Sequence, residues 1–133
     1  MKPNLADVVK DVADRLSRDV VPVLTGFAAN NVAMSAAMLT MVSEKWDSAA
    51  ANLVDENTGM IALLRQGDAA GIMAHDVSPY DPLADLRISA LEALNSRLRG
   101  ALIDLHVAVE QSDKAEARAL DAAIWKELKL STD

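Results

Sequence analysis

The residues of this sequence that are best suited to chemistry gather between residues 75 and 81. This stretch holds an imidazole, two carboxylates, a hydroxyl and the chain's single phenol, supplied by His75, Asp76, Ser78, Tyr80 and Asp81. Such groups can transfer protons in acid–base catalysis. Asp and Ser are also ordinary turn residues, and the serine lacks the context of a nucleophile elbow. The simpler interpretation is a solvated loop, with His75 and Tyr80 as its candidate site residues.

The other histidine, His106, stands one helical turn before Glu110 in an apolar stretch. Its spacing predicts an imidazole at the edge of a core, paired with that carboxylate. Metal-binding bundles use Glu-x-x-His spacing, which neither histidine has, and the chain has no cysteine. A glycine motif that could hold a phosphate is also absent. We therefore predict no metal, no cofactor and no catalytic residue.

A third group of candidates lies in a stretch without charge, residues 20–43. At least one of Asn30 and Asn31 is expected to be buried there, fixing helix register or orienting a ligand. Met34, Met38 and Met41 are most simply core residues, although adaptable surfaces for acyl chains or partner helices use methionine as well. An exposed Trp46 or Trp125 would favour such a surface. The candidate ligand- or partner-binding residues are Asn30, Asn31, Met34, Met38 and Trp46.

The length and net charge of the chain limit the classes of protein to which it can belong. With 133 residues the chain is long enough for one domain, residues 1–133, and its net charge of −7 argues against binding nucleic acid. We find no export signal, and the uncharged stretch contains too many Asn, Ser, Thr, Gly and Ala residues to span a membrane well. These features predict a cytoplasmic protein of bacterial type.

Helical spacing of apolar residues runs through most of the chain, and no strand pattern is present. A first helix is expected from Asn4, its N-cap, to near Val21, where Pro22 ends it. A second begins at Thr25 or Gly26 and continues to about Val54, where Asp55, Glu56, Asn57 and Gly59 interrupt it.

Two short helices are then expected over 58–66 and 68–74, followed by the loop over 75–82. Asp81 and Pro82 resemble an N-cap and a first helical residue, so a long helix should run from Leu83 to near Gln111. Asp113 and Glu116 form a capping box for the last helix, whose expected buried face is Ala117, Leu120, Ile124 and Leu128. The sequence predicts an all-α antiparallel bundle of four main helices, with one or two short helices in the middle connection.

The second helix carries two apolar stripes. One repeats every seven residues and the other contains the methionines; their members are Val32, Leu39, Trp46 and Leu53, and Phe27, Met34, Met38 and Met41. A helix that is apolar on two sides is covered on two sides, either by its own bundle or by a partner subunit.

The N-terminal half also resembles a known family. The residues that carry the likeness lie between Pro3 and Leu39, including the turn over 18–24 and the segment 26–33, with a looser echo over 62–68. They are similar to a family of small uncharacterised bacterial all-helical proteins encoded near acyl-CoA dehydrogenases and aminoglycoside-phosphotransferase-like proteins. The resemblance implies an accessory role beside such enzymes and supplies no catalytic residue.

Three functions remain open. The first is a non-enzymatic helical interaction protein that forms a homodimer and binds another protein, without nucleic acid or membrane insertion. The second is a small-molecule or acyl-group binder, with a pocket between the long helices lined by Met34, Met38, Leu94 and Leu98. The third is an enzyme that uses the loop over 75–81, which requires His75, Asp76 and Tyr80 to converge.

Overall fold

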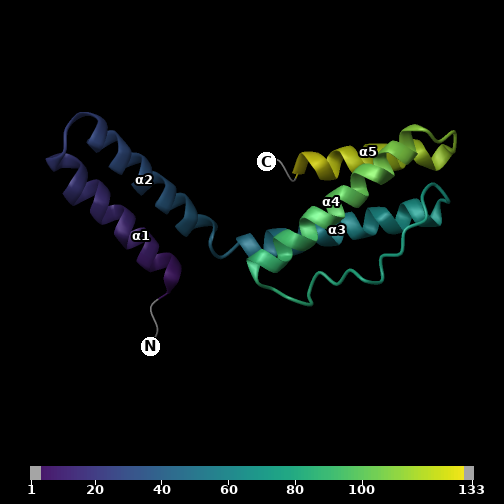
Figure 1. Ribbon diagram of the computed structural model, residues 1–133, viewed down its shortest axis with the longest axis horizontal. Coiled ribbons are helices and arrows are strands. Elements are labelled where there is room, and N and C mark those ends of the chain that lie inside the picture. Colours follow the sequence, from purple (N-terminus) through teal and green to yellow (C-terminus); the bar gives the residue numbers. More distant parts are fainter. Residues whose placement is uncertain (1–3, 131–133) are drawn as a thin grey trace. The chain divides into compact units, whose positions relative to one another are not determined.

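The computed structural model describes residues 4–130, apart from the side chain of residue 130. Every regular element in this part of the chain is helical, which confirms the all-α prediction (Figure 1). The chain forms two compact units, Met1–Ala49 and Ala50–Asp133. Pro3, where the family resemblance begins, lies outside the described residues. No helix among those described is long and apolar enough to cross a membrane.

The first unit, which we call the N-terminal hairpin, contains α1 (Leu5–Arg15) and α2 (Gly26–Lys45). The predicted N-cap is confirmed, because the side chain of Asn4 accepts a hydrogen bond from the Ala6 amide at 2.9 Å. After α1 the chain continues through a π-helical turn, Leu16–Val20, and a 3₁₀ turn, Val21–Val23. Pro22 lacks an amide hydrogen, so the helix ends there as predicted.

α1 and α2 lie side by side and approach closely through small residues (Figure 1). The buried residues at this contact are Ala6, Ala13 and Ala36, and Ser43 Oγ donates a hydrogen bond to the Ala6 carbonyl at 2.7 Å. The face of α2 turned to this contact also includes half-buried Ala29, Val32, Leu39 and Thr40. The residues of the other stripe, Phe27, Met34, Met38 and Met41, lie on the opposite side of α2 and are exposed.

The prediction that the second helix continues to Val54 is wrong. α2 ends at Lys45, residues 46–48 form a turn, and α3 (Ala49–Ala69) begins after it. Ser48 Oγ donates to the Lys45 carbonyl at 3.4 Å, so a side chain takes over one of the carbonyls that the end of the helix leaves unpaired. The seven-residue stripe is therefore divided, with Leu53 on a different helix from Val32 and Leu39.

The predicted interruption at Asp55–Gly59, and with it the separate short helices over 58–66 and 68–74, is also wrong. α3 runs through this stretch because tertiary contacts satisfy its unusual residues. Asn57 is fully buried and donates to the Leu91 carbonyl at 3.2 Å. Gly59 leaves space for the Glu127 carboxylate, since a Cβ there would lie 2.8 Å from Glu127 Oε1.

The predicted loop over 75–82 is confirmed as irregular, but the next helix, α4 (Ile88–Glu110), begins later than the predicted Leu83. Asp81 accepts from the Leu83 amide at 2.9 Å, and Asp85 accepts from the Arg87 amide at 3.1 Å. Both aspartates thus close local turns instead of capping a long helix. The predicted end of this helix near Gln111 is confirmed.

The second unit, which we call the three-helix unit, packs α3, α4 and α5 (Ala115–Leu130) around one core. α4 contributes four of its most completely buried side chains, Leu91, Leu98, Leu102 and Leu105, and Leu64 of α3 and Ile124 of α5 are equally buried. The predicted buried face of α5 is confirmed for Ala117, Leu120 and Ile124, and Leu128 packs against the core while partly exposed. Each fully buried leucine stabilises the fold by about 1.5–3 kcal/mol.

Two glycines of this unit give a matched test of the packing. A Cβ on Gly67 of α3 would lie 2.5 Å from Cδ1 of fully buried Leu105, whereas a Cβ on Gly100 of α4 would meet nothing within 4 Å. We expect Gly67→Ala to lower the free energy of unfolding by about 1–3 kcal/mol through overpacking. Gly100→Ala should raise it by about 0.5–1 kcal/mol, because alanine favours an exposed helix. Urea unfolding followed by circular dichroism measures both. Equal effects of the two substitutions would contradict the close crossing of α3 and α4.

Candidate functional site

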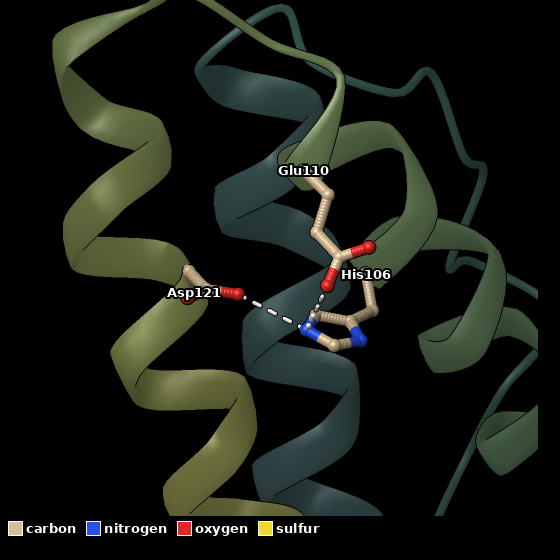
Figure 2. A group of neighbouring side chains, drawn as sticks. All are labelled: His106, Glu110 and Asp121. Carbon is tan, nitrogen blue, oxygen red and sulfur yellow. Dashed lines mark hydrogen bonds and ion pairs between the residues drawn. The ribbon is translucent and has the colours of Figure 1, made fainter.

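One imidazole and two carboxylates meet on the three-helix unit, where α4 and α5 lie together (Figure 2). His106 and Glu110 stand one turn apart on α4, and Asp121 comes from α5. The His106 Nε2 atom lies 3.0 Å from Asp121 Oδ1 and 3.5 Å from Glu110 Oε1. Figure 2 shows this one ring nitrogen facing both carboxylates. We call the three residues the His106 cluster.

The surroundings of His106 hold the ring in place. Its neighbour Leu105 is fully buried in the core, and the His106 side chain is only 17% exposed. The indole of Trp125, one turn after Asp121, meets the imidazole edge-on with 5.1 Å between ring centroids. The ring is therefore fixed from the core side and from α5, while both carboxylates are more exposed.

A cavity of about 220 Å³ adjoins the cluster. Its lining residues come from α4, α5 and the turn between them: Val109, Glu110, Ser112, Ala117, Arg118 and Asp121. Because two of the three donors border this cavity, a small ligand or water could reach the cluster from solvent. Such a group of donors can share a proton or hold a cation.

The sequence predicted only part of this arrangement. The pairing of His106 with Glu110 is confirmed, because an i, i+4 pair on a helix is visible in the sequence. Asp121 was missed, since its place depends on how α5 packs against α4. A donor set assembled from two helices in this way does not follow the Glu-x-x-His spacing that was considered.

The loop over 75–81 brings together two of its three proposed groups. His75 Nε2 and the Tyr80 hydroxyl are 3.2 Å apart, and the rings stack with a centroid distance of 5.7 Å. The Arg97 guanidinium lies 5.3 Å from the centre of the Tyr80 ring. Asp76 is exposed and accepts from the Ser78 amide at 3.0 Å, and hydrogen bonds from Ser78 lower the pKa of its carboxyl. The enzyme hypothesis requires Asp76 to converge with His75 and Tyr80, but Asp76 pairs with Ser78 instead.

The candidates on α2 are all exposed, which corrects two predictions. Neither Asn30 nor Asn31 is buried, and Met34 and Met38 are each 64% exposed instead of belonging to a core. α1 covers only one side of α2, and these four residues lie outside that side. Trp46, in the turn after α2, is also exposed.

The buried amides belong instead to Asn57 and Asn95 of the three-helix unit. The sequence pattern indicated Asn57 only as a helix breaker and gave no sign that Asn95 is buried. Asn95 Nδ2 donates to Asn57 Oδ1 at 3.0 Å, and Arg99 Nε donates to Asn95 Oδ1 at 2.8 Å. The Arg99 Nη2 atom also lies 3.6 Å from Glu56 Oε1, as an ion pair. The network satisfies polar groups inside the unit, so its role is structural.

A larger cavity, of about 460 Å³, lies between α3 and α5. Its walls are mostly small or apolar and consist of Gln66, Ala69, Ala70, Glu116, Ala119 and Leu120. None of the residues predicted to line an acyl pocket takes part, and Leu98 is fully buried in the core.

The geometry defines an all-helical protein with a polar cluster on one unit and an exposed apolar stripe on the other. No family model matches the chain, and searches of curated proteins and of solved structures found no match.

The carboxylate beside Gly59 gives a prediction about pH. Burial, and after it the negative charge of Glu56, raises the pKa of Glu127. Because this pKa is higher in the folded state, the ionised carboxylate lowers stability at neutral pH and has no such effect once the pH falls below the ordinary glutamate pKa. We expect Glu127→Gln to raise Tm by roughly 1–3 °C at pH 7, with the gain disappearing near pH 4.

The matched control is Glu92→Gln, an exposed position on α4 with the same change in charge. Thermal unfolding measured from pH 4 to pH 8 compares the two variants. A gain for Glu127→Gln that does not depend on pH, or that equals the gain for Glu92→Gln, would refute the burial effect.

Proposed function

We propose that this chain is a non-enzymatic helical interaction protein that forms a homodimer through the exposed stripe of α2. We call this surface the methionine stripe; it consists of Phe27, Met34, Met38 and Met41. The observation that carries the proposal is the position of these side chains, which are 57–80% exposed on the side of α2 that α1 does not cover.

The N-terminal hairpin lacks a core of large side chains. Its buried residues are alanines, whereas ten large apolar side chains in its described part are exposed: Leu5, Val8, Val12, Val23, Phe27, Met34, Met38, Met41, Val42 and Trp46. Soluble monomers rarely expose a contiguous apolar surface beyond a few hundred Å². A partner that covers this surface would supply the burial that the hairpin lacks.

The charge distribution allows a second copy of the chain to be that partner. The chain carries a net charge of −7, so two copies repel each other over most of their surface. Residues 20–43 carry no charge and therefore let two copies approach.

Several predictions from the sequence are untested and stand beside the proposed dimer. The cytoplasmic location and the accessory role beside acyl-CoA or phosphotransfer enzymes stay predictions, as does the single domain. The antiparallel bundle of four main helices competes with the dimer, because a chain that covers its own stripe would be a monomer. A bound small molecule, for which the 460 Å³ cavity has a suitable size, is the second candidate function.

The test is native mass spectrometry of the full chain, together with light scattering over a range of concentrations. We expect a dimer without added mass. Met38→Glu should raise the dimer Kd at least about 100-fold, because burying like charges at an interface costs several kcal/mol. Circular dichroism should show unchanged helix content.

Ile103→Glu is the matched control, because Ile103 is an exposed apolar residue of α4, outside the hairpin. It should leave the dimer intact. A wild-type monomer at tens of micromolar, or a Met38→Glu variant that still dimerises, would refute the interface. A reproducible added mass on a monomer would replace the proposal with the small-molecule binder.

A further inference from the structure

We infer that the His106 cluster binds a divalent transition-metal cation, for which zinc is the best fit. The site would use His106 Nε2 and one carboxylate oxygen each from Glu110 and Asp121. This inference concerns the three-helix unit alone and does not depend on the dimer.

The spacing of the donors suits a small cation. One potential ligand atom from each residue lies within 4.8 Å of the other two. Zinc binds nitrogen and oxygen ligands at about 2.0–2.1 Å, so two ligands of a tetrahedral site are about 3.3 Å apart. The two distances from His106 Nε2, 3.0 and 3.5 Å, lie on either side of this value. The two carboxylate oxygens lie within 4.8 Å of each other, so rotation of the Glu110 and Asp121 side chains would have to bring them to the same spacing.

The kinds of donor also select the class of metal. An imidazole nitrogen favours zinc, copper or nickel over magnesium and calcium, which prefer oxygen alone. Two carboxylates balance the charge of a divalent ion, so the bound site is neutral when the imidazole is neutral. Both carboxylates face the same ring nitrogen, so the three donors already converge on one place.

The site has a defined rigid part and an open side. His106 is held by the core and by Trp125, while the Glu110 and Asp121 side chains are 61% and 39% exposed and can adjust. The 220 Å³ cavity beside the two carboxylates leaves room for water as a fourth ligand. Arg118 borders this cavity and is exposed, so its long side chain can turn to solvent when a cation enters.

Trp125 provides a direct readout of binding. The chain has two tryptophans, so Trp46→Phe makes Trp125 the only one. Nickel bound to His106 should quench the fluorescence of the adjoining indole in a saturable manner. Zinc should compete with nickel for the site, and native mass spectrometry should show one zinc ion per chain. We expect a micromolar Kd for zinc and a rise of several degrees in Tm at saturation.

Variants assign the ligands. His106→Gln and Asp121→Asn should each weaken zinc binding at least tenfold and move the quenching by nickel to at least tenfold higher nickel concentrations. Asp121 is only partly buried, so its variant keeps the test valid if His106→Gln fails to fold. His75→Gln removes the only other histidine and should bind as tightly as the parent. The inference is overturned if zinc binds no tighter than millimolar, or if His75→Gln reduces binding as much as the cluster variants do.

Discussion

The buried leucine stripe of α4 is the constraint on which the site in the three-helix unit depends. Leu98, Leu102 and Leu105 are fully excluded from solvent between α3 and α5, and this fixes the rotation of α4 about its axis. Because the rotation is fixed, His106 lies at the edge of the core and its ring nitrogen faces α5. A helix turned by one residue, about 100°, would point the imidazole elsewhere and separate it from Asp121. The cluster is thus a consequence of apolar packing.

The sequence predicted well what depends on neighbouring residues. Four correct predictions follow from local chemistry: the N-cap at Asn4, the break at Pro22, the irregular loop over 75–82 and the buried face of α5. Asn57 and Gly59 show where such reasoning fails. Both are weak helix formers, yet α3 continues through them because Leu91 and Asn95 pair with the amide and Glu127 fills the space beside the glycine. Those partners lie more than thirty residues away in the chain.

The same distinction between local and distant partners applies to the candidate site residues. His106 with Glu110, and His75 with Tyr80, are close in the chain, and the structure brings each pair together. Asp121 could be found only from the packing of two helices. For the methionines of α2 the sequence predicted burial in a core, which is wrong. The spacing of apolar residues shows that a helix face favours burial, but it does not show whether another element of the chain covers that face. In α2 the alanine face meets α1, and the methionine face is left exposed.

The two units therefore reach stability by different physical means. The three-helix unit buries large side chains from all three helices and satisfies its inner amides, so its fold has an internal source of stability. The N-terminal hairpin buries little more than alanines, and burying an alanine contributes far less than burying a leucine. Most of its large apolar side chains lie exposed on its surface, where they add little to the stability of the hairpin itself. The His106 cluster lies outside the core of the three-helix unit, so a ligand there would not replace core packing. Under the proposed dimer, by contrast, the hairpin would use for recognition the same apolar surface that it leaves exposed.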